Sequence, residues 1–151
     1  MNYAKPTGAL KEYSQVGVHS GIASATPHRL IQMLMEGALE KIAAAKGAMT
    51  RGDIPVKGAQ ISWAISIIDG LRMSLDMEAG GEIADNLNRL YDYMGRRLVE
   101  ANLKNEPAYL DEVANLLKEI KSAWDAIPSD VRKAHAENSP EPPPTVATAK
   151  G

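Results

Sequence analysis

The spacing of apolar residues constrains this chain more than any other feature. Toward the end of its regular part they recur every three or four positions, which at about 100° per residue places them on one face of a helix. These positions are Leu110, Val113, Leu117, Ile120, Trp124 and Ile127. No useful length of the chain alternates apolar and polar residues with the period of two typical of a strand. The pattern therefore predicts an all-α fold.

Four segments show this helical spacing, and short connections separate them. Thr26 suits an N-cap and Pro27 a first turn, so the first helix is expected to begin there. Gly80 and Gly81 are interpreted as a turn between helices. The predicted helices span residues 27–50, 56 to 75 or 77, 82–101 and about 107–127. Four helices of similar length joined by short turns pack most simply as an antiparallel up-down four-helix bundle.

Less regular segments are expected on both sides of this bundle, which we assign to residues 23–127. Residues 1–22 carry glycine, proline and scattered apolar residues without sustained periodicity, which indicates a loosely ordered N-terminal arm. Residues 128–151 are rich in proline and have too little apolar content to bury, which predicts a disordered C-terminal tail. About 105 residues in the bundle are enough for one domain to fold alone.

The composition argues against several classes of function. The chain has 17 Lys and Arg against 19 Asp and Glu, which gives no field strong enough to gather nucleic acid or an acidic membrane surface. It has no cysteine, so disulfide and thiolate chemistry are absent. No segment resembles a signal peptide, and none approaches the stretch of about 18 apolar residues that spans a bilayer. We therefore expect a soluble, cytoplasmic protein without membrane insertion or nucleic-acid binding.

The sequence offers no arrangement typical of a catalytic or metal site. A carboxylate-bridged metal bundle needs Glu-x-x-His, and none of the three histidines has a Glu three residues before it. A histidine phosphotransfer bundle is the sharper rival, but His28, beside Arg29, lies at a helix start and is interpreted as a solvated residue. Glu36 and Glu40 are interpreted as neighbours on a polar helix flank. We therefore expect no enzymatic activity, no cofactor and no metal.

The second predicted helix carries more apolar surface than one buried face requires. Trp63, Ile67 and Leu71 widen its apolar arc to roughly 200°, whereas an ordinary bundle helix needs about 100° or slightly more. The small residues Gly70 and Ser74 accompany them. Two explanations are open: the helix contacts two neighbours in its own bundle, or this flank forms an exposed groove for an amphipathic helix of another protein. Self-association of a purely structural bundle is a third possibility.

The apolar arc of the first predicted helix is widened in the same way by Met33 and Gly37. A glycine inside a helix costs about 1 kcal/mol relative to alanine, which is easier to understand at Gly37 and Gly70 if another element packs close there. Methionines at positions 33, 35, 73 and 77 add flexible surface suited to a varied partner. We therefore favour the groove, formed by the flank of the second helix with Met33 and Gly37 of the first.

Tyr93 lies near the edge of the third predicted helix opposite its apolar stripe, where water is expected. In one interpretation its ring lies along a neighbouring helix or the arm, and its hydroxyl stays wet or bonds to a backbone group. In the other, Tyr93 and Asn86 form polar contacts with the backbone of a bound client at a groove edge. A Tyr93→Phe variant that loses client affinity at unchanged melting temperature would support the second interpretation.

Three stretches of this chain resemble the FliS family of flagellar secretion chaperones, in that family's order and spacing. They are ASATPHRLIQMLMEGALEKIAAAK, GGEIADNLNRLYDYMGRRLVEAN and DEVANLLKEIKSAW. The resemblance covers about residues 13–127, including Tyr13 in the arm and the late Trp124. Met35 departs from the family pattern, because many members have tyrosine there, but it keeps an apolar side chain.

The resemblance implies an antiparallel four-helix bundle that binds newly made flagellin in the cytoplasm. Family members hold the C-terminal segment of flagellin, which is disordered when free and becomes largely helical when bound. They keep subunits from polymerising early and bring them to the flagellar type III export gate. We therefore predict that the groove holds flagellin. We also predict that the arm, with Tyr13 and Val16, covers part of the groove until flagellin binds.

Overall fold

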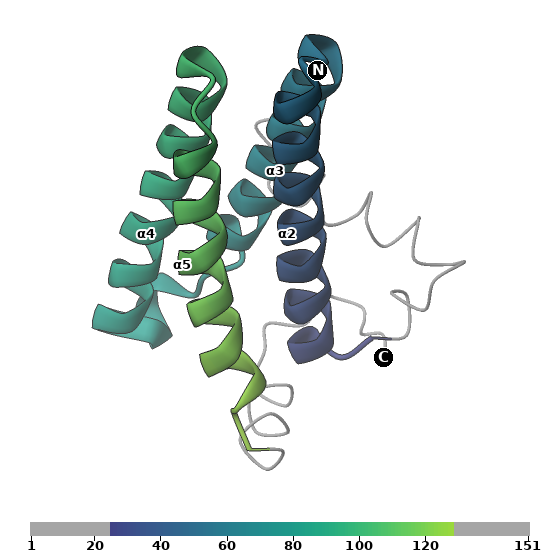
Figure 1. The fold of residues 1–151 in the computed structure, drawn as a ribbon. Helices are drawn as coiled ribbons and strands as arrows, with labels where there is room; N and C mark the ends of the chain where they lie inside the picture. Colours follow the sequence, from purple (N-terminus) through teal and green to yellow (C-terminus); the bar gives the residue numbers. More distant parts are fainter. Residues whose placement is uncertain (1–24, 129–151) are drawn as a thin grey trace, which may run out of the picture.

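The computed structural model describes residues 25–128, and within them four α-helices form an up-down bundle (Figure 1). The helices are α2 (Pro27–Arg51), α3 (Ile54–Met73), α4 (Met77–Lys104) and α5 (Pro107–Asp125). Each helix contacts the one before it, and α5 returns to α2, so the order around the bundle follows the chain. The predicted all-α antiparallel bundle is confirmed. The predicted arm and tail, with Tyr13 and Val16, lie outside the described residues.

Capping residues define where α2 begins and ends and where α3 begins. The first helix begins as predicted, since the Thr26 hydroxyl accepts a hydrogen bond from the Arg29 amide at 3.1 Å. It ends at Gly52, whose φ of 73° is readily available only to glycine. The Asp53 side chain then accepts a hydrogen bond from the Val56 amide at 3.3 Å. The second helix therefore begins at Ile54, two residues earlier than predicted.

The connection between α3 and α4 is a bend that we call the elbow, residues 73–83. Asp76 caps the start of α4 by accepting a hydrogen bond from the Ala79 amide at 3.0 Å. The helix breaks at Gly81, whose φ of 52° and ψ of −128° are not helical. Regular helix resumes after this break, at the predicted start near Glu82. The glycines predicted as a turn thus bend α4 within its first turns.

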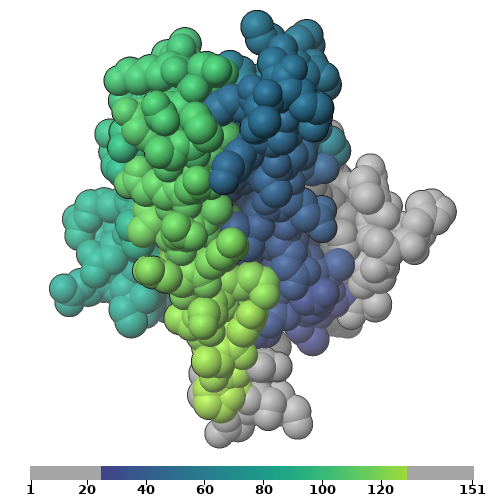
Figure 2. Space-filling view, in the orientation of Figure 1, coloured from purple at the N-terminus to yellow at the C-terminus, as the bar shows by residue number. Residues whose placement is uncertain are grey.

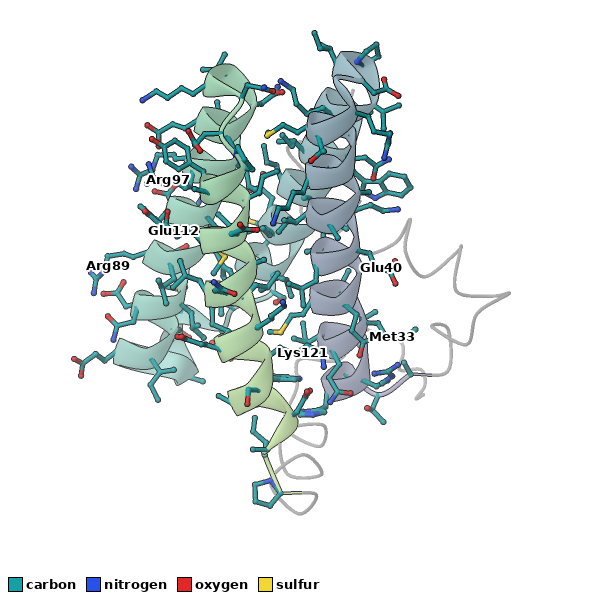
Figure 3. The ribbon with its side chains drawn as sticks, in the orientation of Figure 1. Met33, Glu40, Arg89, Arg97, Glu112 and Lys121 are labelled. Carbon is teal, nitrogen blue, oxygen red and sulfur yellow. The ribbon has the colours of Figure 1, made fainter. Side chains whose placement is uncertain are left out.

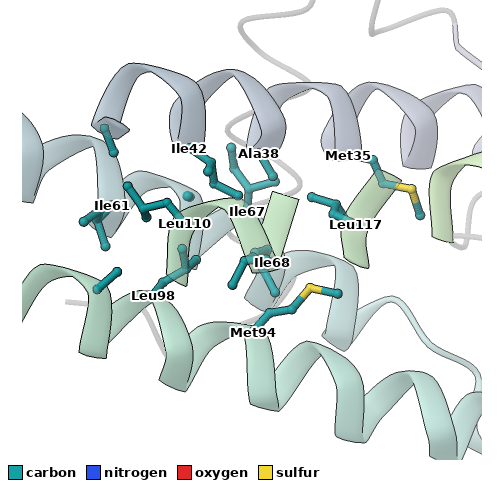
Figure 4. Packing of buried hydrophobic residues seen from close by; sticks show 14 of the residues in the cluster. Met35, Ala38, Ile42, Ile61, Ile67, Ile68, Met94, Leu98, Leu110 and Leu117 are labelled. Carbon is teal, nitrogen blue, oxygen red and sulfur yellow. The ribbon is translucent and has the colours of Figure 1, made fainter. Parts of the chain in front are cut away.

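The core lies between the four helices and contains side chains from all of them (Figure 4). The buried face of α2 includes small residues such as Ala38 and Ala45, which have no exposed surface and let α3 approach closely. A Cβ added at Gly37 would lie 3.6 Å from Cδ1 of Ile67, in ordinary van der Waals contact. The largest fully buried side chains are those of Met35, Ile61, Ile67, Ile68, Leu71, Met94, Leu98, Leu110, Leu117 and Val113.

A buried lysine joins the start of α3 to the end of α4. Lys57 is only 7% exposed, and its Nζ donates hydrogen bonds to the Asn102 carbonyl at 3.2 Å and to Asn105 Oδ1 at 3.0 Å. Burying a cation is unfavourable unless its hydrogen bonds are satisfied, and these two acceptors offset part of that cost. The role of Lys57 could not be recognised from the sequence pattern, because its acceptors lie 45 and 48 residues away.

Replacing Gly81 by Ala tests the elbow. Because an L side chain is strained at the backbone angles of Gly81, the variant should lose about 1–3 kcal/mol of unfolding free energy in urea denaturation followed by circular dichroism. Gly95→Ala is the matched control in the same helix, because nothing lies within 4 Å of the added Cβ. That control should be neutral or stabilising by up to about 1 kcal/mol. Equal stability of Gly81→Ala and the wild type would contradict the assignment.

Candidate partner-binding surface

The flank of α3 predicted to form a groove is only partly exposed. Trp63 is 47% exposed and Ser74 is also exposed, whereas Ile67 and Leu71 are each 1% exposed and Gly70 is buried. The prediction of an exposed flank is therefore wrong for Ile67, Gly70 and Leu71. They are covered because α3 contacts both α2 and α4, which is the alternative explanation of its wide apolar arc.

The two predicted members on α2 lie at the edge of the same helix pair. Met33 and Gly37 are half-buried, and Figure 3 shows Met33 on the side of α2 away from α5. A Cβ at position 37 would make only an ordinary van der Waals contact with Ile67, so the packing of α3 does not by itself require glycine there. Met35, by contrast, is 1% exposed and belongs to the core, so it adds no surface for a partner. The binding role predicted for Met33 and Gly37 stays a prediction.

A lysine that no sequence motif indicated lies over the exposed tryptophan. Nζ of Lys41 on α2 is 3.8 Å from the centroid of the Trp63 ring on α3, a cation–π geometry that holds the indole in place. Met33, Gly37 and Lys41 follow one another at intervals of four residues and so run along one side of α2. We call Met33, Gly37, Lys41 and Trp63 the Trp63 patch. Only the packing of α2 against α3 reveals the role of Lys41.

Tyr93 takes part in a polar network that joins α4 to α5. Its hydroxyl donates a hydrogen bond to Glu112 Oε2 at 2.5 Å. Arg97 Nε donates to Glu112 Oε1 at 2.7 Å, and Figure 3 shows Arg97 on α4 and Glu112 on α5. The Arg97 guanidinium also lies 3.6 Å from the centroid of the Tyr109 ring. The expected hydrogen bond to a backbone group is therefore wrong, because a carboxylate on the next helix accepts the hydrogen bond of the hydroxyl.

This network shifts the ionisation of its members. The hydrogen bonds from Tyr93 and then from Arg97 lower the pKa of Glu112, and the hydrogen bond to Glu112 raises the pKa of Tyr93. Asn86 lies outside this set of contacts, since its Oδ1 accepts a hydrogen bond from Arg89 Nη2 at 2.7 Å on the exposed side of α4. Contact of Tyr93 or Asn86 with a client stays a prediction.

His28 is not the solvated residue that its position at a helix start indicated. It is 6% exposed, and its ring stacks on that of Trp124 with centroids 4.8 Å apart and planes 9° from parallel. Trp124 Nε1 donates a hydrogen bond to the His28 carbonyl at 3.0 Å. This contact between α2 and α5 joins residues 96 positions apart, so helical spacing along α2 alone could not reveal it.

Residues 25–128 contain no candidate for a metal site or a membrane-spanning helix. No group of three or more His, Asp or Glu side chains in this part of the chain is placed to hold a metal ion. None of its helices is both long enough and apolar enough to cross a membrane.

A helical bundle that carries a half-exposed tryptophan beside a lysine has the features of a protein-binding module. Residues 9–131 match the family described as Flagellar protein FliS. The chain therefore belongs to the FliS family, as the resemblance of its three sequence stretches predicted.

Curated relatives agree with this assignment. The chain is 57% identical over 119 residues to flagellar secretion chaperone FliSB of Pseudomonas aeruginosa, a match covering 79% of this chain and 94% of the relative. It is 49% identical over 123 residues to flagellar secretion chaperone FliS of Vibrio cholerae, a match covering 82% of this chain and 90% of the relative. For FliS of Salmonella typhimurium the identity is 50% over 119 residues, covering 78% and 88%. The family is one of chaperones acting in flagellar export, not of enzymes.

Replacing Glu112 by Gln should lower the unfolding free energy at pH 7 by a small amount, as expected for a network that is partly open to solvent. The pKa of Glu112 in the folded protein lies below its ordinary value of 4.5. Its stabilising contribution is thus fully present above that value and is lost as the pH falls through the folded-state pKa. Urea denaturation should show a difference between wild type and variant that shrinks below about pH 4.5.

Glu119→Gln is the matched control, because Glu119 is an exposed residue of the same helix. Its unfolding free energy should follow that of the wild type across this pH range. A Glu112→Gln difference that persists unchanged into acid would show that the carboxylate charge is not the stabilising element.

Proposed function

We propose that this protein is a cytoplasmic export chaperone that binds the C-terminal segment of flagellin. In this role it prevents premature polymerisation of flagellin and assists its delivery to the flagellar type III export apparatus. The observation that carries the proposal is the Trp63 patch, in a chain whose relatives are named flagellar secretion chaperones. Its exposed tryptophan is the residue type most often found at the energetic centre of protein interfaces.

The physical requirement on the binding surface follows from the state of the client. A segment that is disordered when free must lose conformational entropy on binding, so apolar burial has to offset that cost. The indole of Trp63 supplies a large apolar area to the patch. Its cation–π contact with Lys41 already restricts the side chain, so Trp63 loses less conformational entropy when the client binds. An amphipathic helix of the client would place its apolar face over the ring and its polar edge beside Lys41.

The predicted polar contacts of Tyr93 and Asn86 with the client would lie on a different helix from those that form the Trp63 patch. Both residues belong to α4, whereas the Trp63 patch is formed by α2 and α3. Contact with both places requires a client segment long enough to pass around the bundle. Client binding at Tyr93 would also compete with its hydrogen bond to Glu112. We therefore assign the main anchoring role to Trp63.

Titration calorimetry with a peptide of the flagellin C-terminal segment tests this proposal. We expect a stoichiometric complex, a gain of helical circular dichroism, and an affinity at least about tenfold lower for Trp63→Ala, in the range of interface hot spots. Leu103→Ala is the control, because Leu103 is 79% exposed near the end of α4 and is not part of the patch. Both variants should keep the helical circular dichroism of the folded wild type.

Two results would contradict the proposal. Equal affinity of Trp63→Ala and the wild type would remove the patch from the client site. Sedimentation that shows self-association but no complex with the peptide would instead support the self-associating structural bundle.

The phosphotransfer alternative is disfavoured by the surroundings of His28. A histidine that receives a phosphoryl group must be accessible to its donor, whereas this one is 6% exposed and stacked on Trp124. Transfer of radiolabel from a phosphorylated kinase, abolished by His28→Ala, would overturn our interpretation.

A further inference from the structure

We propose that the elbow is a docking surface for a second protein, separate from the client. The partner we infer presents a helix with aliphatic residues along one face and Lys or Arg side chains beside them. The elbow contains no residue of the Trp63 patch, although it includes Ser74, which the sequence pattern places beside the predicted client groove. Met73, where the elbow starts, lies ten residues along α3 from Trp63, or about 15 Å at the rise of an α-helix.

The first observation is a concentration of exposed apolar side chains in one short segment. Met73 is 52% exposed, Met77 46% and Ile83 72%. Single apolar residues scattered on a surface need no explanation, but three large ones within residues 73–83 favour burial by another molecule. Methionine side chains are flexible and polarizable, which suits them to an interface.

The second observation is the charge around these side chains. The carboxylates of Asp76, Glu78, Glu82 and Asp85 are all exposed, and residues 73–88 contain no Lys or Arg. Arg89 pairs with one of them, Asp85, at 3.3 Å. The remaining negative charge repels anionic lipids and nucleic acid and attracts cationic side chains. Charge complementarity therefore selects a basic protein segment as the occupant.

The third observation is that the backbone fixes the shape of the elbow. A Cβ at Gly80 would lie 2.6 Å from the Cβ of Ala84, and Gly81 occupies a positive φ, so both positions require glycine for this bend. Figure 2 shows the first turns of α4 standing out from the body of the bundle at the lower left. A preformed projection loses little conformational freedom when a partner binds it.

Exposed apolar residues also occur at the opposite end of the bundle, but, among the described residues, beside exposed cations and not beside exposed carboxylates. Leu103 is 79% exposed and Ile54 69%. The exposed residues near them in the chain include two cations, Arg51 and Lys104, and the neutral Asn105. Leu103 therefore provides a matched control for Ile83, with similar exposure on the same helix.

The test uses a synthetic helical peptide of about 18 leucine and lysine residues, long enough to form a helix, with leucine along one face. We expect it to change the amide chemical shifts of Gly80, Gly81 and Ile83 in ¹⁵N spectra of the full chain. Ile83→Lys should raise the Kd at least tenfold, and Leu103→Lys should not change it. A peptide with glutamate in place of lysine should bind at least tenfold more weakly. Added salt should raise the Kd of the lysine peptide, because it screens the charges.

Several results would overturn the proposal. These are equal effects of Ile83→Lys and Leu103→Lys, equal binding of the two peptides, or shift changes confined to residues outside the elbow. Self-association of the chain alone that Ile83→Lys abolishes would make the elbow a contact between copies. Binding to anionic vesicles that Ile83→Lys abolishes would make it a membrane contact.

Measuring the affinity of the same variants for the flagellin peptide provides an independent test. Because the elbow is separate from the Trp63 patch, Ile83→Lys should bind the flagellin peptide as the wild type does. If Trp63→Ala leaves flagellin binding intact while Ile83→Lys abolishes lysine-peptide binding, the proposed client site fails and the elbow proposal holds. If Ile83→Lys weakens flagellin binding as much as Trp63→Ala does, the elbow belongs to the client site and the proposal of a separate partner fails.

Discussion

The close packing of α2 against α3 is the contact on which the rest of this bundle depends. Small residues on α2 and the buried Ala64 on α3 bring the two helices together, and Ile67 lies against Gly37. A larger side chain at the buried alanine positions would force the helices apart or drive side chains off their preferred rotamers. The same approach places Lys41 over Trp63. Packing of the core and presentation of the candidate binding surface are therefore two results of one helix pair.

Polar contacts hold the other two helices in register with this pair. The Trp124 indole joins α5 to the first turn of α2, Glu112 joins α5 to α4 through Tyr93 and Arg97, and Lys57 joins α3 to the end of α4. Hydrogen bonds of this kind contribute modestly to stability but depend strongly on geometry. They favour one alignment of the helices over others that would bury a similar apolar area.

The two candidate surfaces differ in physical character. The Trp63 patch combines an aromatic ring with a cation, whereas the elbow combines flexible aliphatic side chains with carboxylates. A chaperone that hands its client to another protein has a use for separate surfaces, since one partner then need not displace the other. Opposite charge at the two places would also help to direct different segments to each of them.

The sequence alone determined the helices, because their periodicity, caps and glycines are local signals. Thr26 begins α2 as predicted, and α4 becomes regular after Gly81, near the predicted start at Glu82. The family was also readable in the three sequence stretches, which lie within the match over residues 9–131. These features depend on neighbours in the chain, which a sequence shows directly.

Only the tertiary structure decided which apolar and aromatic residues remain exposed. Trp63 and Ile67 lie one helical turn apart on the same flank of α3, yet the first is 47% exposed and the second 1%. Likewise, the position of His28 at a helix start predicts a solvated ring, whereas in the structure Trp124 stacks on it. Burial depends on which side chains other helices bring to a position, and helical periodicity carries no information about those distant neighbours.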